Sequence, residues 1–192
     1  MGKYHPDIRQ SQNFIDNPRL ITSLLDMADI GGADLVLEVG PGTGAITRQL
    51  ADRAGAIIAV EQDIRLARGL IQSLAGKSNV KVINADFLRY SLPEQRFKVV
   101  ANIPFNLTAD IIRKLFTGSE NSPESAYLIM QEEAAGKFIG KPKATLMSTM
   151  LGINYDVSSL RRISRRAFVP SPRVDASFIA FLKKDEPVVD ER

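Results

Sequence analysis

Short apolar runs alternate with amphipathic segments along most of this chain. Each run lasts about five residues and ends at a glycine or a polar residue, as buried strands of a parallel sheet do. The segments between them place apolar residues three or four positions apart, which is the spacing of one helix face. The pattern predicts strands at 35–39, 56–60, 80–84, 97–101 and 126–130, and helices at 18–28, 45–53, 63–74, 108–116, 132–139 and 145–155.

The C-terminal part has a different pattern. Residues 157–163 and 176–182 alternate or run apolar, and the segment between them is basic and contains prolines. We predict that these two stretches pair as an antiparallel hairpin at the end of the sheet. Because alternating strands and helices indicate a parallel sheet, the predicted fold class is α/β, with a Rossmann-like, mostly parallel sheet. Residues 1–17 are interpreted as a leader, 18–184 as one folded domain and 185–192 as a polar tail.

A glycine turn follows the first predicted strand, at Gly40, Gly42 and Gly44. Glycine lets the backbone turn sharply and lets a ligand approach where a Cβ would otherwise stand. Such a turn at the start of a helix is a frequent cofactor site. The spacing matches the dinucleotide pattern Gly-x-Gly-x-x-Gly/Ala only loosely, so an NAD-type oxidoreductase stays an alternative at this point.

Polar residues follow the next three predicted strands. In an open α/β sheet, ligands bind in the crevice at the carboxyl ends of the strands. Glu61 is placed there to accept from ribose hydroxyls, and Asp86 to accept from an adenine amine with Phe87 beside the base. Asp86 as a turn cap and Phe87 as a core residue are the structural alternatives. With Asn102 after the fourth strand, these positions predict a nucleoside-sized ligand.

The sequence Asn102-Ile-Pro-Phe105 is typical of a site for an exocyclic amine. The asparagine oxygen and the carbonyl before Pro104 are two acceptors, and Phe105 offers a stacking surface for a flat base. Accepting both hydrogens pulls the nitrogen toward tetrahedral geometry and directs its lone pair. A sulfonium methyl group would then need no strong base, because it leaves as a neutral thioether. The alternative is a proline turn with a capping asparagine.

Composition narrows the chemistry. The 192 residues include no cysteine and one histidine, His5, which excludes disulfides and cysteine catalysis and argues against a metal site. Hydrophobic residues make up 44% of the chain, but no apolar run approaches the roughly 20 residues of a membrane span. We therefore expect a cytoplasmic monomer without membrane contact. Leu146, Met150 and Leu151 are interpreted as core residues.

Basic residues gather in two groups, although the net charge is only +3. Clustered arginines and lysines favour a polyanionic partner, since each phosphate contact adds salt-sensitive affinity. A solvated basic surface is the alternative. The candidate RNA-binding residues are Lys141, Lys143, Arg161, Arg162, Arg165, Arg166 and Arg173.

Several motifs occur together and in order, over nearly the whole chain. They are Ser11-Gln-Asn-Phe-Ile15, Glu38-Val-Gly-Pro-Gly-Thr-Gly44, Glu61, Ala85-Asp-Phe87, Asn102-Ile-Pro-Phe105 and Phe168-x-Pro-x-Pro-x-Val174. Their combination resembles the ribosomal RNA adenine N6-methyltransferases. That superfamily includes the erythromycin-resistance enzymes, which act on 23S RNA, and the small-subunit dimethyladenosine transferases. Ser-Gln-Asn-Phe-Ile and Asn-Ile-Pro-Phe resemble the resistance enzymes more than the small-subunit enzymes, which usually have Gly-Gln-Asn-Phe-Leu and Asn-Leu-Pro-Tyr.

This resemblance implies a class I methyltransferase fold over residues 18–184, S-adenosylmethionine as methyl donor and an adenine of 23S RNA as acceptor, with macrolide-type resistance as the outcome. It implies that Asn102 orients the target amine and that Phe105 and Phe168 stack on the target base. The catalytic set is then Asn102, Pro104, Phe105 and Phe168. The cofactor-binding set is Gln12, Asn13, Ile15, Glu38, Gly40, Gly42, Gly44, Glu61, Asp86, Phe87 and Asn102.

The chain departs from this family at one point. Family members usually continue into a small helical C-terminal domain that helps to hold RNA, and we expect that domain to be absent here. The basic residues would then make more of the phosphate contacts. A small-subunit dimethyltransferase and a non-catalytic RNA-binding paralogue remain alternatives, but the intact Asn102–Phe105 motif argues against the paralogue. An oxidoreductase would lack a proton-transfer group, since the single histidine lies in the leader.

Overall fold

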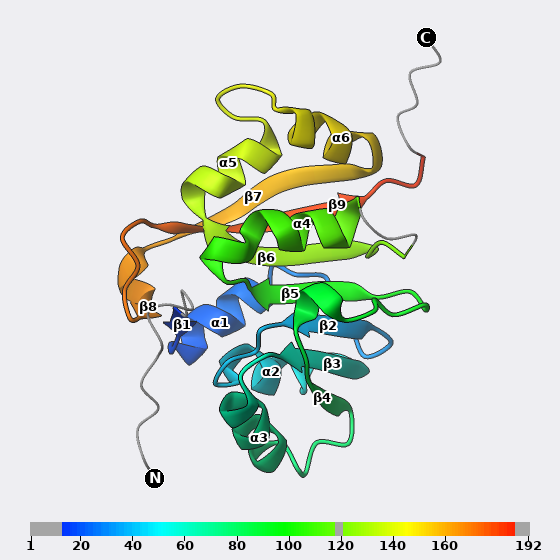
Figure 1. Ribbon diagram of the computed structural model, residues 1–192, viewed down its shortest axis with the longest axis vertical. Helices are drawn as coiled ribbons and strands as arrows, with labels where there is room; N and C mark the ends of the chain where they lie inside the picture. The colour runs from blue at the N-terminus through cyan, green and yellow to red at the C-terminus, as the bar shows by residue number, and fades with distance from the viewer. Residues whose placement is uncertain (1–12, 118–120, 187–192) are drawn as a thin grey trace.

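A twisted sheet forms the centre of the molecule in a computed structural model that describes residues 13–117 and 121–186 (Figure 1). Within these residues, seven strands follow the order β4-β3-β2-β5-β6-β9-β7. The first five run parallel, and β9 is antiparallel to both β6 and β7, which confirms the predicted fold class. The strands are β2 Leu35–Val39, β3 Ala56–Glu61, β4 Val80–Asn84, β5 Lys98–Asn102, β6 Ser125–Gln131, β7 Tyr155–Ile163 and β9 Ala176–Lys183.

Helices cover both faces of the sheet. One apolar cluster packs α1, α2 and α3 against the sheet, and a second packs α4, α5 and α6 against the opposite face. The helices are α1 Pro18–Leu25, α2 Ala45–Leu50, α3 Ile64–Ser73, α4 Thr108–Phe116, α5 Glu132–Ile139 and α6 Leu146–Asn154, and the 3-10 turns are η2 Phe87–Arg89, η3 Phe105–Leu107 and η4 Arg165–Ala167. No helix in the described part of the chain is long and apolar enough to cross a membrane.

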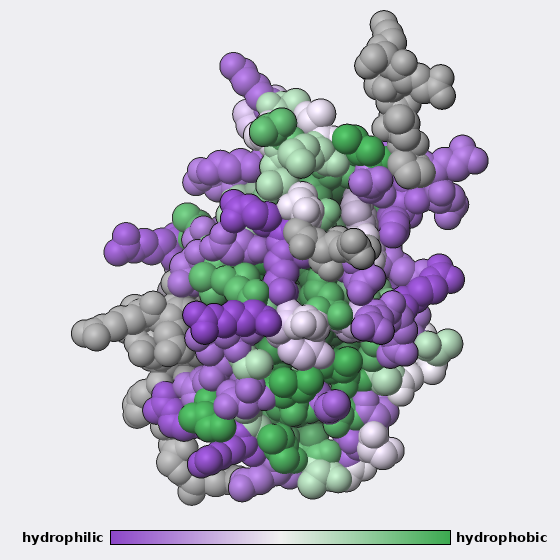
Figure 2. Space-filling view, turned by 45° about the vertical axis from the view of Figure 1, so that its right-hand side comes forward, coloured by the Kyte–Doolittle hydropathy of each residue, from purple (hydrophilic) through white to green (hydrophobic). Residues whose placement is uncertain are grey.

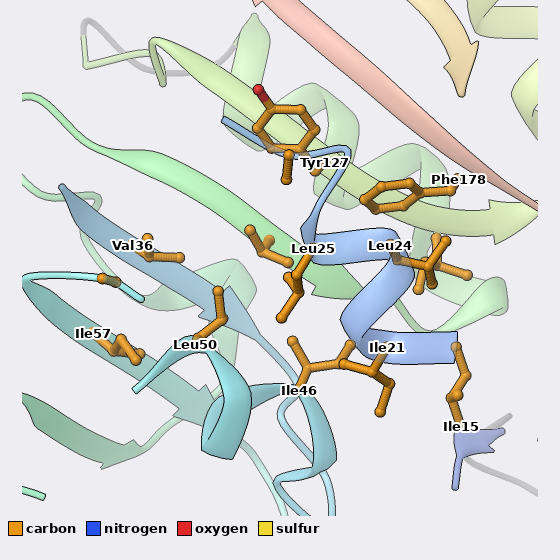
Figure 3. Close-up of a cluster of buried hydrophobic side chains, with 14 of the residues drawn as sticks. Ile15, Ile21, Leu24, Leu25, Val36, Ile46, Leu50, Ile57, Tyr127 and Phe178 are labelled. Atoms are coloured by element: carbon orange, nitrogen blue, oxygen red, sulfur yellow. The ribbon is translucent and has the colours of Figure 1, made fainter. Parts of the chain in front are cut away.

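Helix α1 joins the two halves of the sheet through its apolar face. Leu24 and Leu25 lie in the same buried cluster as Tyr127 of β6 and Phe178 of β9 (Figure 3). The backbone amide of Asp29, just after this helix, donates to the Tyr127 hydroxyl at 3.0 Å. Each fully buried leucine contributes about 1.5–3 kcal/mol, so this contact fixes the start of the chain on the sheet.

The predicted capping residues Asn17 and Asp63 lie at helix starts, the predicted ends of α4 and α5 are confirmed, and α1 and α2 end earlier than expected. Asn17 accepts from the backbone of Leu20 at 3.1 Å, and Asp63 accepts from Arg65 at 2.8 Å. The predicted ends of α1 and α2 were each three residues too late. The chain there continues in tighter i→i+3 turns, for example from Ala28 N to Leu25 O, so apolar spacing persists after the α-helix has ended.

Helix α6 lies at the outer end of the sheet, over β7 (Figure 1). Leu151 is buried as predicted, but the interpretation of Leu146 and Met150 as core residues was wrong, since their exposed fractions are 80% and 44%. A helix at the edge of a sheet has neighbours on one side only. Apolar and polar side chains accordingly share the surface of the molecule (Figure 2).

A second, very short sheet was not predicted. β1, Phe14–Ile15, pairs antiparallel with β8, Phe168–Val169, so that Phe14 opposes Val169 and Ile15 opposes Phe168. Two-residue strands carry no readable periodicity, and these two are more than 150 positions apart. This pairing attaches the end of the predicted leader to the segment between β7 and β9, beside the carboxyl ends of the parallel strands.

Candidate active site

The glycine turn after β2 needs its glycines for two reasons. Gly40, Gly42 and Gly44 have φ values of 64°, 59° and 79°, a region that side chains with a Cβ rarely adopt. A Cβ on Gly42 would also lie 2.4 Å from a ring carbon of Phe14, and one on Gly44 would lie 2.2 Å from a methyl carbon of Leu70. The turn is therefore closely packed from both sides.

Glu61 fixes this turn from the end of β3. Its Oε2 accepts from the backbone N–H of Gly42 and its Oε1 from that of Asp63, both at 2.9 Å. The side chain is almost fully buried, and this burial raises the pKa of Glu61. Each carboxylate oxygen has two acceptor positions, so a held Glu61 still has capacity for ribose hydroxyls.

A cavity of about 310 Å³ opens beside Glu61 at the carboxyl ends of the strands. Asp86 lines it and also caps η2, because its Oδ1 accepts from the backbone of Leu88 at 2.9 Å. Phe87 is a core residue and also lines the cavity. Asp86 is thus a turn cap and Phe87 a core residue, as the structural alternatives stated, and both also line the cavity. The lining also includes Gly40, Pro104, Leu107 and Ile111, and Asn106, which sequence reasoning missed although it directly follows the Asn-Ile-Pro-Phe motif.

Asn102 lies beside this cavity at the end of β5. Its Nδ2 donates to the backbone carbonyl of Asn13 at 2.7 Å. Its Oδ1 is buried and has no hydrogen-bond partner among the described residues. A buried acceptor without a partner costs about 1–3 kcal/mol, so this atom is poised to accept from a ligand. A smaller space of about 60 Å³, which Phe14, Glu61 and Phe105 also line, adjoins it.

The two predicted stacking rings lie together but differ in exposure. The centroids of Phe105 and Phe168 are 6.2 Å apart and the rings meet edge to face at 70°. Phe105 is half-buried, whereas Phe168 is 2% exposed and belongs to the apolar core with Ile15. In this conformation Phe105 alone of the two offers ring surface toward the site, and Phe168 supports it from behind.

Glu38 lies behind the glycine turn and is 1% exposed. Its burial raises the pKa to about 8, an effect that the neighbouring Thr47 opposes. Its Oε2 has no hydrogen-bond partner in the described part of the chain. Burial therefore favours the neutral form of Glu38, which lies next to a space of about 20 Å³ that Ile15, Gly40 and Asn102 also line. Gln12, the remaining predicted cofactor ligand, lies outside the described residues.

The arginines of the first predicted basic group do not share one surface. β7 has a bulge between Ser159 and Arg161, and the following residues alternate between the two faces of the sheet. Arg161 donates to Ser23 of α1 on one face, whereas Arg162 forms ion pairs with Glu132 and Asp175 at 3.2 and 3.0 Å on the other.

The other basic residues occupy two further places. Arg165, Arg166 and Arg173 lie together in the segment around η4 and β8, where the Arg165 guanidinium donates to the Arg173 carbonyl at 3.1 Å. Lys141 and Lys143 lie in the loop between α5 and α6, at the top of Figure 1 and away from that segment. The segment that carries Arg165, Arg166 and Arg173 includes β8, which pairs with β1 beside the glycine turn.

The family comparison agrees with this geometry. Residues 6–192 match the family model described as "Ribosomal RNA adenine dimethylase". The chain belongs to the ribosomal RNA adenine dimethylase family. A glycine turn, an acidic residue on the next strand and Asn102-Ile-Pro-Phe105 therefore occur here in a family whose description names RNA adenine as the modified group.

Individual relatives of this dimethylase family member carry two kinds of name. It is 38% identical to a "Probable ribosomal RNA small subunit methyltransferase A" of Methanopyrus kandleri, over 94% of this chain and 65% of the relative. It is 33% identical to an "rRNA adenine N-6-methyltransferase" of Bacillus licheniformis, over 92% of this chain and 62% of the relative. The chain thus spans less than two thirds of the length of both curated relatives.

A solved structure supports the same assignment. The crystal structure of the 23S rRNA methyltransferase ErmE superposes with a TM-score of 0.85 at 32% identity, over 93% of this chain and 72% of that one. The dimethylase family site of this chain therefore sits in a fold that one known 23S RNA methyltransferase shares. Sequence reasoning did not single out Phe14 and Asn106, which line the two spaces, or the hydrogen bond from Asn102 to the Asn13 carbonyl, which only spatial proximity reveals.

Proposed function

We propose that this protein transfers a methyl group from S-adenosylmethionine to the N6 amine of an adenine in ribosomal RNA. The observation that carries the proposal is the Asn102 amide, whose buried Oδ1 has no partner among the described residues. Asn102 lines a small space together with Glu61 and Phe105. A methyl donor on one side and a flat base on the other would meet at Asn102 Oδ1.

The residues present fit S-adenosylmethionine. Glu61 would accept from the ribose hydroxyls, Asp86 from the adenine amine, and Phe87 would form a wall beside the base. Gly40 and Asn13 would contact the methionine end, where the backbone of the glycine turn allows close approach. When bound, S-adenosylmethionine supplies an electrophilic methyl group on a sulfonium that leaves as a neutral thioether.

The chain's own contribution is to hold and orient the acceptor. Asn102 Oδ1 and the carbonyl that precedes Pro104 would accept the two hydrogens of the amine, which directs its lone pair. Phe105 would stack on the target base, supported edge-on by Phe168. Acting on a paired adenine would require the base to be flipped out of its helix, so an unpaired adenine is the preferred acceptor.

Arg165, Arg166 and Arg173 are proposed as the RNA phosphate contacts nearest to the site. They surround the β8 segment that carries Phe168, so a phosphate bound there would lie on the same side as the target base. Lys141 and Lys143 would contact a more distant part of the RNA. Arg161 and Arg162 are proposed to hold the sheet together, because both already have partners within the protein.

The first candidate acceptor is 23S RNA, with macrolide-type resistance as its consequence. The Asn102-Ile-Pro-Phe105 sequence and the likeness to ErmE support it. The second candidate is small-subunit RNA, which the 38% identity to the Methanopyrus kandleri protein favours. Both use the same chemistry at Asn102 and differ in how the RNA is held.

The deciding experiment is transfer of radiolabelled methyl groups from S-adenosylmethionine, offered side by side to protein-free 23S RNA and to small-subunit particles. Label at adenine N6 in 23S RNA alone, with raised macrolide tolerance in an expressing host, is the expected result. Label in the small subunit alone would move the protein to the second candidate. Label in neither RNA, with S-adenosylmethionine bound at a measurable Kd, would refute the proposal.

A further inference from the structure

β1 and the residue before it, Asn13, contact three parts of the candidate site. The ring of Phe14 packs on Gly42, and Ile15 is buried and pairs with Phe168 of β8. The backbone carbonyl of Asn13 accepts from Asn102 Nδ2 at 2.7 Å. Since the glycine turn holds β1 on one side and β8 holds it on the other, the Asn13 carbonyl has a fixed place against the Asn102 amide.

An asparagine amide has two orientations of nearly the same shape. A half turn about its last bond exchanges Oδ1, an acceptor, with Nδ2, a donor. Only the orientation with Nδ2 toward Asn13 leaves Oδ1 available to accept from an amine. In the opposite orientation Oδ1 would face the Asn13 carbonyl oxygen, and an N–H group would face the N–H groups of the target amine. Both contacts would then be unfavourable.

We infer that the backbone carbonyl of Asn13 is a positioning group for methyl transfer, because it holds the Asn102 amide with Oδ1 toward the target amine. The inference rests on the proposed function and adds to it a role for the backbone of the residue just before β1. It is separate from the contact with the methionine end of the donor that the family resemblance implies for Asn13. Sequence motifs cannot show this role, since any residue at position 13 has a carbonyl.

Asn102→Asp separates the two tasks of the amide. An ionised carboxylate can accept from the amine, but its second oxygen would face the Asn13 carbonyl. A protonated carboxyl group regains a donor for Asn13 while its other oxygen accepts. At pH 8 we expect the variant to transfer methyl groups about 100-fold more slowly than the wild type. The ratio of the variant rate to the wild-type rate should rise about tenfold per pH unit as one proton is regained toward pH 6.

Other titrating groups have to be separated from this effect. Among the residues that line the two small spaces beside Asn102, Glu38 of β2 and Glu61 of β3 are the titratable ones, and burial raises the pKa of both. Because both are present in the wild type and in Asn102→Asp, the rate ratio at each pH removes their contribution. A ratio that does not change between pH 6 and pH 8 would count against the inference.

A backbone substitution tests the carbonyl directly. Phenyllactic acid in place of Phe14 converts the Asn13–Phe14 peptide bond into an ester, whose carbonyl is a weaker acceptor, and keeps every side chain. We expect kcat to fall about tenfold while the Kd for S-adenosylmethionine changes by less than about twofold. The matched control is an ester between Phe14 and Ile15, which removes a backbone N–H from the same strand and leaves the Asn13 carbonyl an amide. Its kcat should fall less than that of the Asn13–Phe14 ester, because the Asn13 carbonyl remains an amide acceptor.

A readout without turnover keeps this inference distinct from the proposed function. In ¹⁵N-labelled protein, the Asn102 Nδ2 protons should exchange slowly with water, and about tenfold faster in the Asn13–Phe14 ester than in the control ester. Equal exchange and equal kcat in the two esters would overturn the inference. If the wild-type protein showed slow exchange but methylated neither RNA, the hydrogen bond would be present without a reaction to serve. Both the positioning role of the Asn13 carbonyl in transfer and the proposed function would then be refuted.

Discussion

The parallel and antiparallel halves of the sheet hold their polar residues differently. At the ends of β3 and β5, Glu61 and Asn102 are buried or half-buried, and backbone groups fix them. Around β7, Arg162 is mostly exposed and its partners are the side chains of Glu132 and Asp175. Groups held by backbone are already placed before a ligand arrives, so their ordering costs little on binding. Arg166 of the same half is exposed, so it keeps its rotamer freedom and can adapt to a flexible polymer.

We expect the largest effect from a substitution of Asn102, in the parallel half of the sheet. Asn102→Ala removes the buried acceptor, and we expect the methyl-transfer rate to fall about 10²- to 10³-fold, as when other preorganised polar groups are removed from active sites. The Kd for S-adenosylmethionine should change by less than about threefold, because most of the donor cavity is unaltered. Single-turnover transfer and calorimetric binding, measured on the same preparation, check this. Equal loss of binding and transfer would contradict the role of Asn102.

A second effect of similar size concerns the buried acid behind the glycine turn. Burial raises the pKa of Glu38 from 4.5 to about 8. Between these values the unfolded chain has lost the proton and the folded chain retains it. The stabilisation present below the lower value is therefore lost as pH rises toward 8. Relative to Glu38→Gln, the free energy of unfolding of the wild type should fall by on the order of 3 kcal/mol between pH 5 and pH 8.5.

Urea unfolding of both proteins across that pH range measures the difference. The burial of Glu61 also raises its pKa, so it adds a slope of the same sign to both proteins, and the subtraction removes it. Parallel curves for wild type and Glu38→Gln would show that Glu38 does not retain its proton in the folded protein.

Gly42→Ala should have a smaller effect on the same half. The residue needs φ of 59°, and a Cβ would press against the Phe14 ring at 2.4 Å, so we expect a loss of about 2 kcal/mol in the free energy of unfolding. Gly69→Ala is the matched control, because Gly69 lies within α3 and nothing lies within 4 Å of its added Cβ. That variant should gain about 0.5–1 kcal/mol. If the free energy of unfolding changed in the same direction in both variants, a side chain at position 42 would not strain the turn.

We expect the smallest effect from a substitution of an exposed arginine in the antiparallel half. Arg166→Gln should lower the slope of log K for RNA against log salt by about 0.7, the value for one phosphate contact on a single strand. Arg162→Gln is the control, because Arg162 is engaged with Glu132 and Asp175, and its slope should stay as in the wild type. Filter binding at several salt concentrations measures both. A larger change for Arg162 than for Arg166 would place the RNA surface on the other side of β7.

The sequence predicted the parallel half of the site well because each piece of it is local. A strand, a glycine turn and a helix are neighbours along the chain, and the same rule places Glu61, Asp86 and Asn102 at equivalent strand ends. The antiparallel half was predicted less well. Arg161 and Arg162 were assigned to one surface, but a bulge before Arg161 and the alternation of a strand place them on opposite faces.

Sequence alone therefore determined the fold class, the crevice at the strand ends and the residue types that line it. Tertiary structure decided which of these residues hold one another. The pairing of β1 with β8, the hydrogen bond from Asn102 to the Asn13 carbonyl and the covered ring of Phe168 all join segments far apart in the chain. Such contacts depend on backbone position and packing rather than on a local pattern. For this reason, the orientation of the central amide became visible only in the folded molecule.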